Sequence, residues 1–146
     1  MKKLLLICLA AFAAASCTQE KQQSKPLYMW FDCEGNYATL SHPDSIRYYV
    51  SKIHDMGFTD VVVDVKSIMG ETLYKSDIAP YMGEWDGVTR PENYDLLGYF
   101  IEEGHKLGMR VHGSLNVFAG GHNFFDRGII YGDHADWQSQ VYTEGK

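Results

Sequence analysis

The sequence lacks several features that would assign it to a common class of protein. It has only three cysteines, and its 13 Lys and Arg residues are outnumbered by 19 Asp and Glu residues, which gives a net charge of -6. This acidic balance argues against binding to nucleic acid and against electrostatic binding to anionic lipid headgroups. The two glycines at 120–121 lack a following Gly-Lys-Ser/Thr, so a phosphate-binding loop is unsupported. We expect no cofactor and no metal.

The sequence also lacks an apolar run long enough for a transmembrane helix. Residues 4–15 are apolar, but a helix needs about 20 such residues to cross the hydrocarbon core. This run follows two lysines and ends in small residues, which is typical of a secretory signal peptide. The Ala-Ala-Ser-Cys that ends at Cys17 resembles a lipobox, although Ala14 stands where Leu is usual. The sequence therefore predicts a lipoprotein signal peptide over residues 1–17, with a simple secretory signal as the alternative.

The residues after Cys17 fit a lipid-anchored protein. Residues 18–26 are polar and carry both charge signs, as expected of a flexible tether. Two or three acyl chains on Cys17, at about 0.8 kcal/mol per buried CH₂, would anchor the chain stably. We expect a location in the cell envelope, at the periplasmic or surface face of the outer membrane. Cys33 is then left without a partner, which predicts no intrachain disulfide and a buried structural thiol.

The hydrophobic pattern of the remaining chain alternates between strand and helix signals. Each expected strand is a short apolar run, and each expected helix carries apolar residues at helical spacing and ends at a glycine. Such βαβ units imply parallel strands. The long polar connection at 67–92 is of a kind that tends to be functional. The expected elements are a strand at 27–31, a helix from Pro43 to about Gly57, a strand at 61–65, a helix from about Asn93 to Gly108, and a strand at 110–118.

Alternate positions along the expected strands differ in polarity. In the second strand, valines alternate with Asp64 and Lys66, and in the third, apolar residues alternate with His112 and Asn116. In a (β/α)₈ barrel the polar set faces the interior and the catalytic rim. In an open doubly wound sheet both sets would lie beneath helices, and the charged groups would be costly to bury. The predicted fold is therefore α/β, the N-terminal β-α-β-α-β part of a (β/α)₈ TIM barrel over residues 27–146.

The length of the chain does not suffice for a whole barrel. About 130 residues remain after removal of the signal peptide, whereas a complete barrel takes about 250. Three strands alone would expose a long apolar edge, which favours aggregation. We therefore expect a truncated sequence, with a short protein of small three-layer fold as the alternative.

Several stretches of sequence match one family pattern. The chain has Val-Asp-Val-Lys at 63–66, Gly-Glu-Thr-Leu-Tyr-Lys-Ser at 70–76, Tyr-Asp-Leu-Leu at 94–97, Ile-Glu-Glu-Gly-His-Lys-Leu-Gly-Met-Arg-Val-His at 101–112 and His-Ala-Asp-Trp at 134–137.

On these motifs, residues 27 to about 137 resemble the family 10 glycosyl-hydrolase-like proteins, (β/α)₈-barrel proteins often found as bacterial lipoproteins. The resemblance implies a glycosidase acting on a cell-envelope or captured polysaccharide, such as the glycan of peptidoglycan. Leu96 stands where the family usually has Pro, and Lys66 replaces Arg. The acidic residues most often expected to be catalytic lie on the family's fourth strand, which would follow Lys146. We therefore expect the catalytic residues beyond Lys146 and no activity from this chain alone.

Polar residues at the carboxyl ends of the strands are the candidate site. Glycoside hydrolysis normally needs two carboxyl groups, about 5–5.5 Å apart for retention and 6.5–9.5 Å for inversion. The acids available there include Glu34, and the positive charge of Lys66 is expected to keep Asp64 ionised. The predicted substrate-binding residues are Asp32, Asp64, Lys66, His112 and Asn116.

Two other functions remain open. The chain could be a non-catalytic lipoprotein that binds glycan at the cell envelope. It could also be a barrel metallohydrolase, if Asp32, Asp64, His112 and His122 converge. Such enzymes typically have His-x-His at the end of the first strand, where this chain has Asp-Cys-Glu at 32–34.

Overall fold

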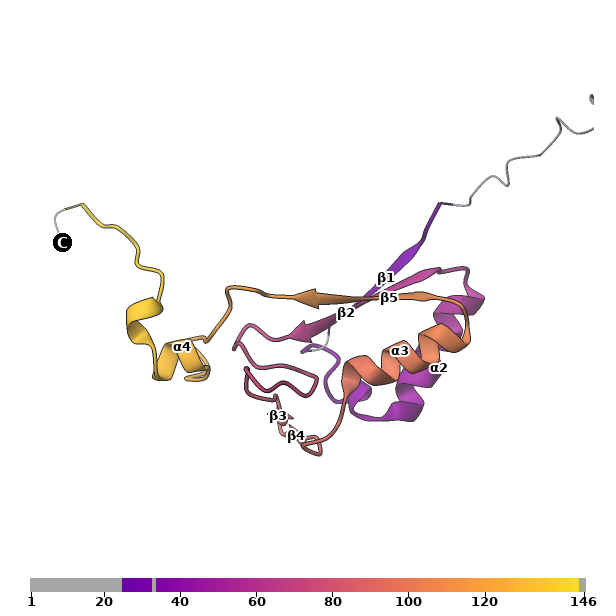
Figure 1. Cartoon of the computed structure of the whole chain (residues 1–146), viewed down its shortest axis with the longest axis horizontal. Helices are drawn as coiled ribbons and strands as arrows, with labels where there is room; N and C mark the ends of the chain where they lie inside the picture. The colour runs from indigo at the N-terminus through magenta and orange to yellow at the C-terminus, as the bar shows by residue number, and fades with distance from the viewer. Residues whose placement is uncertain (1–24, 33, 145–146) are drawn as a thin grey trace, which may run out of the picture.

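A computed structural model describes residues 25–32 and 34–144 of the chain (Figure 1). Its main unit is a parallel three-stranded sheet in the order β1-β2-β5, formed by β1 (Tyr28–Phe31), β2 (Asp60–Lys66) and β5 (Arg110–Leu115). Cys33 and the expected signal peptide with Cys17 lie outside the described residues.

The first crossover helix, α2 (Pro43–Asp55), follows the short 3-10 helix η1 (Thr39–Ser41). Proline at the start of a helix needs no hydrogen bond from its nitrogen, and its fixed φ suits the first turn. The helix buries one side, which carries Ile46, Val50 and Ile53 at helical spacing. The predicted helix is thus confirmed, and Gly57, with φ of 93°, lets the chain turn back towards β2.

The second crossover helix, α3 (Leu96–Lys106), begins three residues later than the sequence indicated. Asp95 caps it, because its Oδ1 accepts a hydrogen bond of 2.9 Å from the backbone N–H of Gly98. Phe100 is fully buried, and its ring lies 4.9 Å from that of Phe31 on β1. The cap therefore starts the helix where its apolar side meets the sheet.

The core lies between the two helices and one face of the sheet. Val61, Val63 and Val65 of β2 point into it and are at most 2% exposed. Figure 1 shows α2 and α3 on the same side of the sheet, so the described part of the chain forms two layers. We call the side beneath the helices the covered face and the other side the open face.

The prediction of a partial (β/α)₈ barrel is wrong. The described residues form an open sheet of three parallel strands with α2 and α3 on the covered face, a separate antiparallel pair, and α4 beyond the carboxyl end of the sheet. Alternating polarity along a strand distinguishes one face of a sheet from the other, but it does not say what lies over the polar face. Tyr28 and Trp30, on the open face, are 53% and 59% exposed, which a packed barrel interior would not allow.

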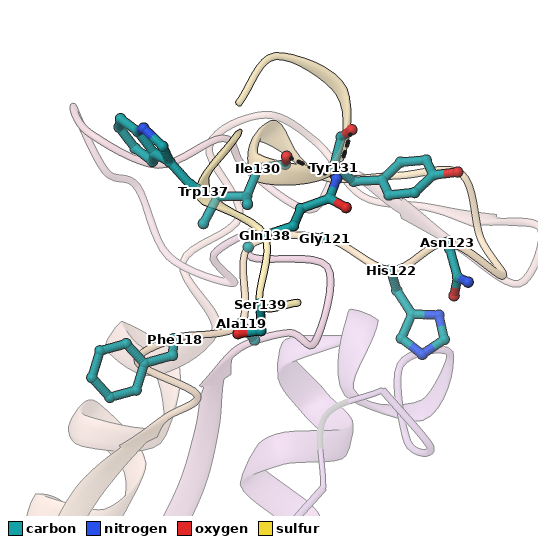
Figure 2. Close-up of a pocket in the computed structure, with 11 residues that line it drawn as sticks. Phe118, Ala119, Gly121, His122, Asn123, Ile130, Tyr131, Trp137, Gln138 and Ser139 are labelled. Atoms are coloured by element: carbon teal, nitrogen blue, oxygen red, sulfur yellow. Dashed lines mark hydrogen bonds between the residues drawn. The ribbon is translucent and has the colours of Figure 1, made fainter. Parts of the chain in front are cut away.

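Two further segments lie at the carboxyl end of the sheet. The connection between β2 and α3 contains the antiparallel pair β3 (Glu84–Trp85) and β4 (Val88–Thr89). After β5, which ends three residues earlier than expected, residues 118–139 fold around α4 (Ile129–Gly132) and the 3-10 helix η2 (Ala135–Trp137) (Figure 2). Among the described residues, no helix combines the length and apolar character that a membrane span requires.

Candidate functional site

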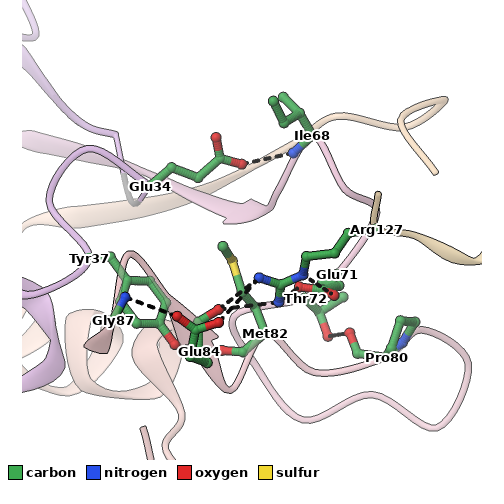
Figure 3. Close-up of polar contacts among 10 residues, drawn as sticks. All are labelled: Glu34, Tyr37, Ile68, Glu71, Thr72, Pro80, Met82, Glu84, Gly87 and Arg127. Carbon is green, nitrogen blue, oxygen red and sulfur yellow. Dashed lines mark hydrogen bonds and ion pairs between the residues drawn. The ribbon is translucent and has the colours of Figure 1, made fainter. Parts of the chain in front are cut away.

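Three carboxyl groups lie near one another at the carboxyl end of the sheet. Asp64 is on β2, Asp32 directly follows β1, and Glu34 lies in the turn after it. Oε1 of Glu34 accepts a hydrogen bond of 2.8 Å from the backbone N–H of Ile68 (Figure 3). Burial raises the pKa of the Glu34 carboxyl against this opposing hydrogen bond, and the carboxylates of Asp32 and Asp64 raise it further. Glu34 therefore keeps its proton to a higher pH than a free glutamate does.

Asp32 shapes the turn that carries Glu34. Its Oδ1 accepts hydrogen bonds of 3.0 Å from the backbone N–H groups of Glu34 and Gly35. Its backbone carbonyl accepts a hydrogen bond of 2.7 Å from Nδ2 of Asn36. Aspartate commonly stabilises turns in this way. The predicted sugar-binding residue Asp32 thus has a structural role in positioning Glu34.

Lys66 anchors the chain that leaves β5. Its Nζ donates hydrogen bonds to the backbone carbonyls of Asn116 (2.7 Å), Val117 (3.3 Å) and Ala119. Burial lowers the pKa of the Lys66 ammonium. Among the described contacts no ion pair joins Lys66 to Asp64, and the ammonium is directed at these carbonyls instead.

His112 lies in the middle of β5 and belongs to a second polar cluster, which extends towards the amino end of the sheet. Its Nε2 lies 2.8 Å from Oδ1 of Asp60, a residue that is fully buried. Nε and Nη2 of Arg110 each donate to the same carboxylate at 2.7 Å, and Oγ1 of Thr59 donates at 2.6 Å. The hydrogen bonds from Arg110 are the main reason why the pKa of the Asp60 carboxyl lies well below its usual range. Burial has the opposite effect and raises this pKa.

Asp60 is not among the site residues that the sequence predicts. Two signals pointed to it: an aspartate begins a valine-rich strand, and Arg110 begins the next strand. Where two neighbouring parallel strands are in register at their first residues, those residues lie side by side. The observed register pairs Asp60 with Arg110 in this way. The charge pair could therefore have been found by aligning the first residues of the two strands.

The open face carries aromatic and polar side chains in rows across the strands. The register aligns Trp30 with Val62 and His112. Asp64 is aligned with Ser114 in the next row towards the carboxyl end. Residues paired across parallel strands point to the same face, so each row presents its side chains together. The open face therefore combines an exposed indole with hydrogen-bonding groups.

The aromatic cluster around Arg90 fixes the β2–α3 connection. The Arg90 guanidinium is 3.7 Å from the centre of the Tyr37 ring and 5.2 Å from that of Tyr94. Its Nη2 donates to the backbone carbonyl of Tyr37 at 2.9 Å and its Nε to Oγ of Ser41 at 2.7 Å. Cation–π contacts are strongest where water is excluded, and Arg90 is 3% exposed.

Arg127 joins this connection to the segment after β5. Its Nε and Nη2 donate to the two carboxylate oxygens of Glu71 at 3.1 and 2.6 Å. Its Nη1 and Nη2 donate to the backbone carbonyl of Glu84 at 3.1 and 3.2 Å (Figure 3). Such a two-pronged guanidinium–carboxylate contact fixes geometry as well as adding energy. The segment at 118–139 is therefore held near the carboxyl end of the sheet.

The structure groups the predicted site residues only in part. Asp32, Asp64, Lys66 and the backbone of Asn116 lie at the carboxyl end, whereas His112 bonds to Asp60 towards the other end. His122 lies in the segment after β5, where its Nδ1 accepts from the N–H of Phe124 at 3.2 Å. Among the described residues, no three His, Cys, Asp or Glu side chains are placed to hold a metal ion.

Comparison with known proteins gives one distant similarity. No family model matches the chain. An S-layer-related protein of Niallia circulans is 28% identical over 125 residues, which make up 82% of this chain and 8% of that protein. The chain thus spans a small part of the length of this curated relative, and the similarity does not assign it to a family.

Proposed function

We propose that this chain binds glycan in the cell envelope through its open face. The observation that carries the proposal is Trp30, which is 59% exposed beside hydrogen-bonding side chains on the same face. A pyranose ring has an apolar face and a rim of hydroxyl groups, so it suits an exposed indole flanked by Asp64 and His112. Exposed aromatic surfaces of this kind mark binding sites more often than isolated apolar residues do.

The similarity to an S-layer-related protein supports a place in the cell envelope. The lipobox-like sequence at Cys17 supports the finer proposal that a lipid holds the chain there, at the outer membrane. Labelling of cells with a radioactive fatty acid tests the anchor. Label on the parent chain and none on Cys17→Ser is the expected result, and equal labelling of both would refute it.

Binding is tested by sedimentation of the whole chain with purified peptidoglycan. Trp30→Ala is expected to weaken binding about tenfold or more, which corresponds to at least about 1.4 kcal/mol. Tyr48→Ala is the matched control, because Tyr48 is 58% exposed but lies on α2, away from the open face. Equal losses in both variants, or no binding by the parent chain, would refute the proposal.

Glycoside hydrolysis is the second candidate, favoured by the raised pKa of Glu34. A carboxylic acid that stays protonated can donate a proton to the leaving sugar oxygen, and a nearby carboxylate such as Asp64 can act as nucleophile or base. The family resemblance of the sequence supports the same chemistry. Release of reducing ends from peptidoglycan glycan tests it.

In that assay, Glu34→Gln is expected to abolish turnover while peptidoglycan binding persists. Unchanged turnover in Glu34→Gln would exclude Glu34 as the acid. Binding without turnover by the parent chain would leave the glycan-binding function and refute hydrolysis by this chain.

A further inference from the structure

The segment after β5 encloses a hollow that is separate from the open face. The hollow has a volume of about 350 Å³ and lies between residues 118–123, the start of α4 and residues 137–139 (Figure 2). Binding sites for small molecules typically occupy about 300–1,000 Å³. The size therefore suits one sugar ring or a ligand of similar bulk.

Close packing around two glycines, against a side chain at Gly120 and against backbone at Gly128, shapes this hollow. A Cβ atom on Gly120 would lie 2.2 Å from Cδ1 of Ile130, and one on Gly128 would lie 2.2 Å from Cα of Gly121. The backbone N–H of Ile130 donates to the carbonyl of Gly120 at 2.8 Å. Only glycine permits these approaches, and a preformed site loses less entropy on binding.

The lining contains no Asp, Glu, Lys or Arg. Its apolar members include Phe118, Ile130, Tyr131 and Trp137. Figure 2 shows the rings of Phe118 and Trp137 on one side of the segment and the ring of Tyr131 on the other. The Trp137 indole is 63% exposed and stacks on His134, with ring centres 4.1 Å apart at an angle of 11°. This stacking fixes one face of the indole and leaves the other available.

The polar part of the lining consists of amide and hydroxyl groups and the imidazole of His122, whose Nδ1 accepts from the N–H of Phe124. Nε2 of Gln138 donates to the carbonyls of Ile130 and Tyr131 at 3.4 and 3.3 Å, which orients its side chain across the hollow. Asn123 and Ser139 supply further donors and acceptors. Aromatic rings beside neutral hydrogen-bonding groups match a ligand that has an apolar face, a hydroxylated rim and no charge.

We infer that this hollow is a second binding site, which takes one uncharged pyranose ring. The ring stacks on Trp137, and its hydroxyl or amide groups bond to Gln138 and its neighbours. A charged sugar is disfavoured, because the lining offers no side chain of fixed opposite charge to compensate its desolvation. The inference depends on the lining of the hollow and does not require the open face to bind glycan.

Tryptophan fluorescence separates the two sites, because the three tryptophans lie in different regions. The variant Trp30→Phe/Trp85→Phe retains only Trp137, and Trp85→Phe/Trp137→Phe retains only Trp30. Titration with chitotriose is expected to shift the Trp137 emission saturably, with a Kd at or below about 1 mM. If the Trp137 emission does not shift at chitotriose concentrations up to about 20 mM, the inference is overturned, whatever the Trp30 emission does. A shift of the Trp30 emission alone would support only the proposed function of the open face.

A matched pair of glutamines tests the polar contacts. Gln138→Leu is expected to weaken chitotriose binding about tenfold, whereas Gln140→Leu, two residues further on and outside the lining, leaves it unchanged. Equal affinities of the two variants would overturn the inference, as would equal binding of a trimer of galacturonic acid. Amide chemical shifts of Gly120 and Gly121 in the unsubstituted chain give the same readout if a variant fails to fold.

Discussion

The two faces of the same sheet follow different rules, and adjacent residues of one strand show it. Val63 lies on the covered face and is fully buried, whereas Val62 lies on the open face and is half-buried. The covered face is uniformly apolar on β2, and the open face carries Asp60, Asp64 and Lys66 on the same strand. One face thus supplies stability, and the other is free to carry charge and exposed rings.

This difference teaches where substitutions should matter. The covered face is packed against α2 and α3, so removing atoms there leaves a cavity. On the open face, Trp30 and Val62 remain in contact with solvent, so they can change with less effect on folding. Substitutions in the buried layer should therefore have the largest effects, and substitutions in the polar groups around the sheet should have smaller ones.

The largest effect is expected from removing an aromatic ring beneath the sheet. Phe100→Ala should lower the free energy of unfolding by about 3–5 kcal/mol, because the fully buried ring leaves a cavity against Phe31. Trp30→Ala, on the open face, should change it by only about 0.5 kcal/mol. Urea unfolding measures both, and similar losses would contradict the assignment of the two faces.

The valine pair sharpens the comparison at constant side-chain shape. Val63→Thr should cost about 1–3 kcal/mol, because it buries a hydroxyl in an apolar layer. Val62→Thr should stay within about 0.5 kcal/mol, since its hydroxyl reaches solvent. The measurement is again urea unfolding. A larger loss at Val62 would mean that the open face is covered in solution.

The Asp60 cluster should make the fold sensitive to acid. The pKa of Asp60 is lowered in the folded chain, so its stabilising effect is present above the unfolded pKa and is lost as pH falls below it. Asp60→Asn should lower the unfolding temperature at pH 7 and flatten its decline towards pH 3. The effect should be smaller than that of Phe100→Ala, because the side chains of Arg110 and His112 are 58% and 43% exposed and can be solvated.

The control for this prediction is Asp64→Asn, on the same strand and face. Its unfolding temperature at pH 7 should fall less than that of Asp60→Asn, because the structure gives Asp64 no hydrogen-bonded cluster comparable with that of Asp60. An unchanged pH profile in Asp60→Asn would show that the cluster does not contribute.

The smallest effect, and one of opposite sign, is expected at Glu34. Its pKa is raised in the folded chain, so deprotonation opposes folding and stability falls as pH rises through that pKa. Glu34→Gln keeps the acceptor for Ile68 and should raise the unfolding temperature at pH 7 by about 2 °C, with no gain at pH 4. Glu92→Gln, at an exposed position, should show no gain at either pH.

Much of the local structure follows from the sequence. The apolar spacing along α2, the proline at its start and the glycine after it were enough to place the helix almost to the residue. The start of α3 was predicted less accurately. Asp95 caps the helix, but the polar residues just before Asp95 carry no signal that excludes an earlier start. The strands were found because short apolar runs between helices leave few alternatives.

The candidate site was harder to predict, because its members meet only through packing. Lys66 and Asp64 are neighbours on one face of β2, which favoured an electrostatic effect of Lys66 on Asp64, but the ammonium of Lys66 donates to three carbonyl oxygens of the chain after β5. His112 shares that face, yet Asp60 binds it at the opposite end. The alternation of residues along a strand predicts the face of the sheet on which each side chain lies. It does not predict which hydrogen-bond partner that side chain has.

The sequence by itself determined the parallel β-α-β-α-β order of the described chain and the two-faced character of its strands, because both depend on local hydrophobic spacing. The tertiary structure decided that the sheet is open rather than part of a barrel. It also brought Glu34 beside Ile68 and closed residues 118–139 around a hollow. Those features depend on contacts between residues far apart in the chain, and local spacing carries no information about such contacts.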